Sequence, residues 1–112
     1  MIILSFNYCG FASTCKKIAL KALFQNYCPD VIMLQESLGV GELVRNSLSK
    51  IMSGWSFVTV DAKGRSRSLA LGIKDSSVKL LNSWGSKLVL GAEVYSSEIF
   101  LEFSLINIYG LC

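Results

Sequence analysis

A short apolar run that ends in two polar residues constrains the fold of this chain more than any other feature. Residues 31–34 read Val-Ile-Met-Leu and follow the turn-forming pair Pro29-Asp30. Such a run is typical of a strand whose two faces are both covered. It leads directly into Gln35 and Glu36. A carboxylate at the end of a buried strand is costly without a cation or a hydrogen-bond donor, so we expect Glu36 to have such a partner.

A strand and a helix precede this run. Residues 1–6 are mostly apolar and include two isoleucines, which predicts a first strand that ends at Asn7. Ser13 or Thr14 can cap a helix that runs to about Tyr27, before Pro29 stops it. The expected apolar face of this helix comprises Cys15, Ile18, Ala19, Ala22 and Leu23.

The order strand, helix, strand predicts a βαβ unit with two parallel strands and a right-handed crossover. Parallel strands present their carboxyl ends at one edge of the sheet, and open α/β sheets tend to bind ligands there. Asn7 and Glu36 both fall at this edge. The spacing therefore predicts that these two residues lie close together.

The rest of the chain changes from a helical to a strand pattern. Residues 42–52 predict a shorter helix, which Gly54 ends. Successive strands joined by short turns, and therefore antiparallel, are expected at residues 55–60, 68–74, 78–84, 87–95 and 98–109.

Composition suggests that part of the fold lies outside this chain. The 112 residues suit one small domain, but 52% are hydrophobic and only 17% are charged, whereas globular chains average about a quarter charged. The last predicted strand would be an aggregation-prone edge without a neighbour. We expect residues 1–112 to form a single incomplete domain. No apolar run approaches the roughly 18 residues of a membrane helix, and no signal peptide is evident, so we expect an intracellular protein, nuclear or cytoplasmic.

The cysteines and basic residues point to no single chemistry. The chain has no histidine, and its four cysteines, at positions 9, 15, 28 and 112, show no C-x-x-C spacing. This disfavours a zinc site and favours buried free thiols. The net charge is +3, which permits a nucleic-acid partner but equally suits solvated faces. Of the 11 basic residues, six form two groups: Lys16, Lys17 and Lys21, and Lys63, Arg65 and Arg67.

Four segments, in order, resemble the motifs of one enzyme superfamily. Residues 5–10, SFNYCG, resemble an S-W-N-x-R-G opening, and residues 34–36 match L-Q-E. Residues 64–71, GRSRSLAL, are similar to a G-x-S-G-G-x-A segment, and residues 107–110, NIYG, match N-x-Y-G. These are motifs of the endonuclease/exonuclease/phosphatase superfamily, which is deoxyribonuclease-I-like. The resemblance is greatest to endonuclease domains of plant LINE-type (non-LTR) retrotransposons.

The resemblance implies the N-terminal half of a four-layer α/β sandwich, with mixed, mainly antiparallel sheets and two helices. It implies phosphodiester hydrolysis with Mg²⁺ or Mn²⁺. Glu36 matches the metal-binding glutamate, Asn7 the asparagine that helps position the phosphate and the metal, and Tyr109 the tyrosine that contacts the scissile phosphate. Arg65 and Arg67 are candidates for DNA phosphate contacts, with a solvated hairpin turn as the alternative.

The departures from the family pattern are equally informative. Full members are about twice this length, and their second half carries a D-x-N pair and a closing S-D-H. We therefore expect an inactive fragment of a metal-dependent DNA endonuclease that nicks target DNA for retrotransposition. Its partners would be DNA, the missing C-terminal half and a reverse transcriptase. The alternatives are another phosphoesterase of the superfamily, such as a phosphoinositide or nucleotide phosphatase, or a degenerate non-catalytic remnant. Cys9 replaces the usual arginine, and Arg67-Ser68 replaces a glycine pair.

Overall fold

The fold consists of two β-sheets and a helical layer. The computed structural model describes residues 1–7, 14–38, 46, 48–50, 52–61, 67–86 and 89–108. One sheet has the strand order β1-β2-β4-β3 and the other β5-β6-β7. The elements are β1 (Ile3–Asn7), α1 (Thr14–Tyr27), β2 (Val31–Leu38), β3 (Trp55–Asp61), β4 (Arg67–Lys74), β5 (Val78–Ser86), β6 (Val89–Ser96) and β7 (Leu101–Ile108).

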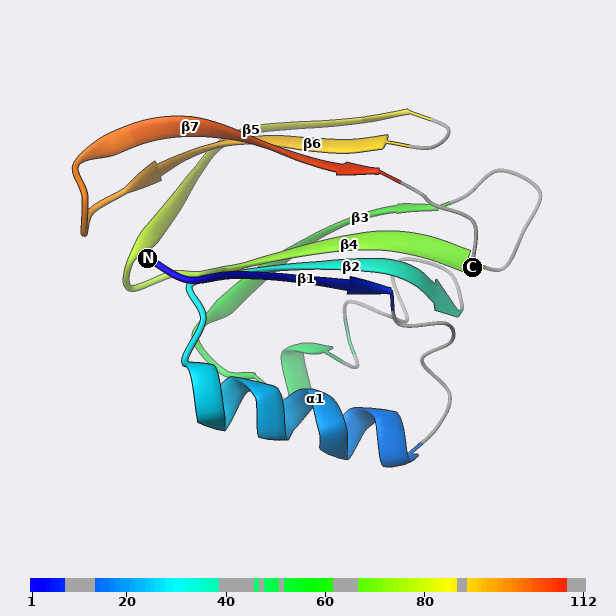
Figure 1. Cartoon of the computed structure of the whole chain (residues 1–112). Coiled ribbons are helices and arrows are strands. Elements are labelled where there is room, and N and C mark those ends of the chain that lie inside the picture. Colours follow the sequence, from blue (N-terminus) through cyan, green and yellow to red (C-terminus); the bar gives the residue numbers. More distant parts are fainter. Residues whose placement is uncertain are drawn as a thin grey trace.

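The two sheets pack face to face, and α1 lies against the outer face of the four-stranded sheet (Figure 1). Within the described residues, the outer face of β5-β6-β7 carries no helix. β1 and β2 pair in parallel with α1 between them, which confirms the predicted βαβ unit. The other strand pairs are antiparallel, as predicted for a mixed α/β sandwich. No helix in the described part of the chain is long and apolar enough to cross a membrane.

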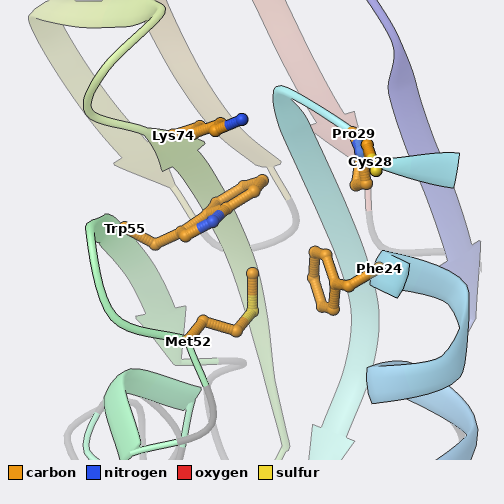
Figure 2. Close-up of a pocket in the computed structure, with 6 residues that line it drawn as sticks. All are labelled: Phe24, Cys28, Pro29, Met52, Trp55 and Lys74. Atoms are coloured by element: carbon orange, nitrogen blue, oxygen red, sulfur yellow. The ribbon is translucent and has the colours of Figure 1, made fainter. Parts of the chain in front are cut away.

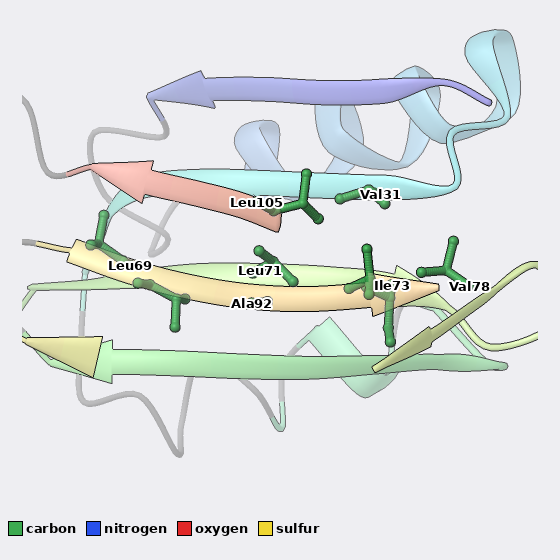
Figure 3. Packing of buried hydrophobic residues seen from close by; sticks show 9 residues of the cluster. Val31, Leu69, Leu71, Ile73, Val78, Ala92 and Leu105 are labelled. Atoms are coloured by element: carbon green, nitrogen blue, oxygen red, sulfur yellow. The ribbon is translucent and has the colours of Figure 1, made fainter. Parts of the chain in front are cut away.

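β2 is buried on both faces, as its apolar run predicted. Ile32 and Leu34 pack on the helix side, where they meet Leu20 of α1 and Leu48. Val31 belongs to the second cluster, which fills the space between the sheets (Figure 3). Its partners there include Leu69, Leu71 and Ile73 of β4, Leu90, Ala92 and Val94 of β6, and Leu105 of β7.

The expected apolar face of α1 is wrong. Leu20 is fully buried and Phe24 packs against the same cluster, but Ile18 is 63% exposed. Apolar residues of α1 are distributed around its circumference, so the sequence alone does not identify the face that packs against the sheet. Cys28 was predicted to be a buried free thiol; it is free, but its side chain is exposed. Its amide donates to the Phe24 carbonyl at 2.9 Å, and its φ of 45° places it in the left-handed region.

Two strand boundaries and one strand pairing also differ from the sequence prediction. Gly85 and Ser86 continue β5 and do not form a turn; a side chain at Gly85 would overlap Val60 of the facing sheet. Residues 97–100 form a turn, so the last strand begins at Leu101. The turn at residues 75–77 connects the two sheets, so β4 and β5 do not pair.

The predicted second helix is described only in part. Asn46 and residues 48–50 are helical, and the Met52 amide donates to the Leu48 carbonyl at 3.0 Å. The remainder of residues 42–52 lies outside the described residues, apart from Met52. Gly54 follows with a φ of 78°, as expected of a residue that ends a helix.

Asp30 joins the start of β2 to both sheets. One carboxylate oxygen accepts from the Ile2 amide at 3.0 Å and the other from the Ser77 hydroxyl at 2.7 Å. The backbone adds a bond from the Lys74 amide to the Asp30 carbonyl at 2.9 Å. Asp30 therefore binds the chain before β1 and the turn into the second sheet through its buried carboxylate, and β4 through its backbone carbonyl.

Burial alone would raise the pKa of the Asp30 carboxyl. The hydrogen bonds from Ile2 and Ser77 oppose this effect, as do the positive charges of the Met1 ammonium and Lys74, and the net result is a lowered pKa. A lowered pKa in the folded state means that the ionised carboxylate stabilises the fold.

We expect Asp30→Asn to lower the free energy of unfolding by about 1–3 kcal/mol at neutral pH, because the neutral amide cannot make both charge-assisted bonds that the buried carboxylate accepts. The difference from the wild type should be fully present above the ordinary carboxyl pKa of about 3.9 and should vanish as the pH falls through the lower folded value. Denaturant titrations between about pH 2 and pH 7 measure it.

Asp75→Asn is the matched control, since Asp75 is exposed and accepts from the Ser56 hydroxyl at 2.7 Å. It should change stability by less than about 0.5 kcal/mol. An equal loss in both variants, or a loss that persists at low pH, would contradict the role of Asp30.

Candidate functional site at the ends of β1 and β2

The first two predicted site residues occupy neighbouring strand ends. Asn7 is the last residue of β1 and lies opposite Gln35 in the parallel register, so Glu36 is the next residue along β2. Arg67 begins β4 and lies opposite Leu38, which places its strand position at the same edge of the sheet. For Asn7, Glu36 and Arg67 the structure describes the position of the backbone in its strand. Tyr109 and Arg65 lie outside the described residues.

A β-bulge interrupts β2 at the site. Leu34 is opposite Ala70 of β4, and the next pair is Ser37 with Ser68. Gln35 and Glu36 therefore both oppose the single residue Leu69. A bulge of this kind bends the strand and re-aims the side chains near it, and bulges are frequent next to active sites. In an unbroken strand, residue 36 would share the face of Ile32 and Leu34, which pack against apolar residues.

A polar cluster that the sequence reasoning missed lies beside the bulge. The Gln35 side-chain nitrogen donates to the Asn107 side-chain oxygen at 2.7 Å and to the Ser5 hydroxyl at 3.1 Å. Asn107 lies on β7, in the other sheet, and is only 1% exposed. The available signal was Asn107 itself, which begins the N-x-Y-G motif and lies between Ile106 and Ile108 in a mostly apolar strand. A buried amide there needs hydrogen-bond partners.

The residue types at the strand ends suit a hard cation. Mg²⁺ prefers oxygen ligands and is usually held by one or two carboxylates together with water and substrate phosphate. Glu36 and Asn7 offer one carboxylate and one amide oxygen on adjacent parallel strands. No group of three or more His, Cys, Asp or Glu residues gathers in the part of the chain that the structure describes. The pair thus fits a partial magnesium site that other groups would complete.

A hollow of about 190 Å³ lies at the opposite end of the sheet (Figure 2). Phe24 and Trp55 form its walls, with their ring centroids 5.3 Å apart and their planes at 68°. Pro29 and Lys74, which also line it, precede β2 and end β4. The hollow is therefore a separate, largely apolar feature, remote from the strand ends that carry Asn7 and Glu36.

No protein-family model matches the sequence, and a search of curated proteins finds no match. Solved structures do match. Two structures of D. rerio TDP2, one humanized by 14 mutations and one complexed with single strand DNA product, have TM-scores of 0.73 and 0.72. Both are 23% identical to this chain and cover 93% of it, while the chain covers 47% and 43% of theirs.

Two proteins from Bacteroides thetaiotaomicron also match. A mannosyl-6-phosphatase has a TM-score of 0.73 at 10% identity, with 95% of this chain and 50% of that chain covered. A protein of the endonuclease/exonuclease/phosphatase family has a TM-score of 0.73 at 10% identity, with 95% and 47% covered. The chain therefore has the deoxyribonuclease-I-like fold of this superfamily, as its motifs predicted, and spans about half the length of the structures it matches.

Proposed function

We propose that this chain is the N-terminal half of a metal-dependent phosphoesterase domain, and that the parent protein nicks DNA as LINE-type retrotransposon endonucleases do. The observation that carries the proposal is that Asn7, the last residue of β1, and Glu36, in the bulge near the end of β2, lie at one edge of the sheet on neighbouring parallel strands. Bound Mg²⁺ or Mn²⁺ would supply positive charge to a phosphodiester. Glu36 and Asn7 would hold the ion, and the Tyr109 hydroxyl would donate to the scissile phosphate.

The free edges of both sheets support a missing second half. Among the strands that the structure describes, β1 pairs only with β2, and β7 pairs only with β6. β7 contacts β2 and β4, while β5 and β6 contact β3 and β4, so β1 and β7 lie on the same flank of the sandwich. The Met1 ammonium is 3.5 Å from Glu98, in the turn before β7. Exposed apolar residues mark this flank: Ile2, Ile3, Leu101, Ile106 and Ile108.

A polypeptide that adds a strand to each of these edges would pair their free backbone groups and cover these side chains. In this proposal the second half of the domain does so, and it brings the general base and the remaining metal ligands. A reverse transcriptase in the same parent protein would use the nicked 3′-hydroxyl as a primer.

We expect the purified chain to bind Mn²⁺ weakly and to leave supercoiled plasmid intact in Mg²⁺, because the base and half of the metal ligands are absent. Agarose-gel nicking assays with wild type and Glu36→Ala measure the activity. Glu93→Ala is the matched control for metal binding, since Glu93 is an exposed strand carboxylate on β6. Robust Mg²⁺-dependent nicking that Glu36→Ala abolishes would contradict the prediction of an inactive half.

The similarity to a mannosyl-6-phosphatase keeps a second candidate open, a phosphatase of the same fold. The gene sequence downstream of the Cys112 codon distinguishes the candidates. We expect a D-x-N, then an S-D-H and then a reverse transcriptase. A continuation with the two catalytic motifs but without a reverse transcriptase would favour the phosphatase, and stop codons would favour a non-catalytic remnant.

DNA binding is proposed for Arg65 and Arg67, of which Arg67 has its strand position at the site edge. We expect the affinity of the chain for duplex DNA to fall with rising salt, and Arg65→Ala/Arg67→Ala to reduce the salt slope by about one for each phosphate that is no longer neutralised. Fluorescence anisotropy at several salt concentrations measures the slope. Lys79→Ala, at an exposed lysine on β5, should leave it unchanged. Salt-independent binding, or equal effects of both variants, would rule out phosphate binding by the arginines.

A further inference from the structure

The side chain of Asn107, on β7, makes three hydrogen bonds to the facing sheet. Its side-chain nitrogen donates to the Leu34 carbonyl at 3.1 Å and to the Ala70 carbonyl at 3.0 Å. Its side-chain oxygen accepts from Gln35 at 2.7 Å. An amide side chain has two N–H donors and one carbonyl acceptor, so both donors and the acceptor are engaged.

The three partners of Asn107 all lie at the bulge in β2. Leu34 and Ala70 form the last regular pair before the bulge, and Gln35 is the first of the two bulged residues. A bulge locally disrupts the ladder of backbone hydrogen bonds, and buried carbonyls there need other donors. Asn107 provides two such donors from the opposite sheet and holds the Gln35 side chain as well. It thus contacts the bulge on both strands.

We propose that Asn107, together with Gln35, is a positioning residue that stabilises the bulge in β2 and thereby sets the direction of the next residue, Glu36. The part of this proposal that concerns metal binding rests on the proposed function; the part that concerns the bulge does not. Asn107 acts through the backbone and through Gln35. It therefore differs from Asn7, which the resemblance assigns to the site itself.

The chain offers variants that separate positioning from general stability. Asn107→Leu removes all three bonds and leaves two buried carbonyls without their donor. Gln35→Met removes only the hydrogen bonds of Gln35 and retains the bonds from Asn107 to the backbone, so it remains informative if Asn107→Leu does not fold. Leu105→Ala is the control, because Leu105 lies on the same strand, two residues away, and packs in the core between the sheets.

Amide hydrogen exchange followed by NMR is the test of the bulge. In Asn107→Leu, we expect exchange at residues 35–37 to accelerate about tenfold or more relative to residues 31–33, and in Gln35→Met by a smaller factor at the same residues. Leu105→Ala should accelerate exchange throughout β2 in proportion to its loss of global stability. A uniform acceleration in Asn107→Leu or Gln35→Met, like that of the control, would overturn the proposal.

Mn²⁺ titrations of the same samples test the link to Glu36. Paramagnetic broadening should centre on Glu36 in the wild type, and the affinity should fall about tenfold in Asn107→Leu and remain unchanged in Leu105→Ala. Equal affinity in the wild type and Asn107→Leu would overturn the positioning of Glu36. An absence of Mn²⁺ binding in the wild type would overturn the proposed metal function, while the exchange data would still decide whether Asn107 holds the bulge.

Discussion

β2 crosses the core with Val31, Ile32 and Leu34 almost completely inaccessible to water, so each polar group along it needs a partner within the protein. Regular pairing with β1 and β4 satisfies most of them. A buried polar side chain lies near each end of the strand. Asp30, directly before β2, accepts from the Ile2 amide and the Ser77 hydroxyl, and Asn107 donates to the carbonyls of Leu34 and Ala70 beside the bulge.

These two side chains also join the sheets. Asp30 accepts from Ser77, in the turn between the sheets, and Asn107 reaches from β7 to β2 and β4. The apolar cluster between the sheets supplies non-directional attraction, but it does not by itself fix their register. Directional bonds at the ends of β2 do so. The strand end that carries Glu36 is therefore defined by contacts from both sheets.

The sequence predicted the elements better than their contacts. Local signals such as Pro29 and Gly54 correctly marked where helices end, and the apolar run of β2 correctly marked a strand buried on both faces. The prediction of the buried face of α1 was wrong, because Ile18 and Leu20 are both strongly apolar and only packing against the sheet distinguishes them. The spacing of the predicted strands places a turn at Gly85, but the close approach of Val60 from the other sheet explains a glycine within a strand.

By itself, the sequence predicted the order of strands and helix and, through its motifs, the deoxyribonuclease-I-like fold that the chain adopts. It also placed Asn7 and Glu36 at the ends of consecutive strands, because strand order and strand polarity follow from local patterns. Only the tertiary structure decided that β4 lies between β2 and β3, that a bulge sits at Gln35 and Glu36, and that Asn107 binds it. The bonds from Asn107 to Leu34 and Ala70 join residues 73 and 37 positions apart, and β2 pairs with β4 across the segment that contains β3. No local pattern encodes such pairings.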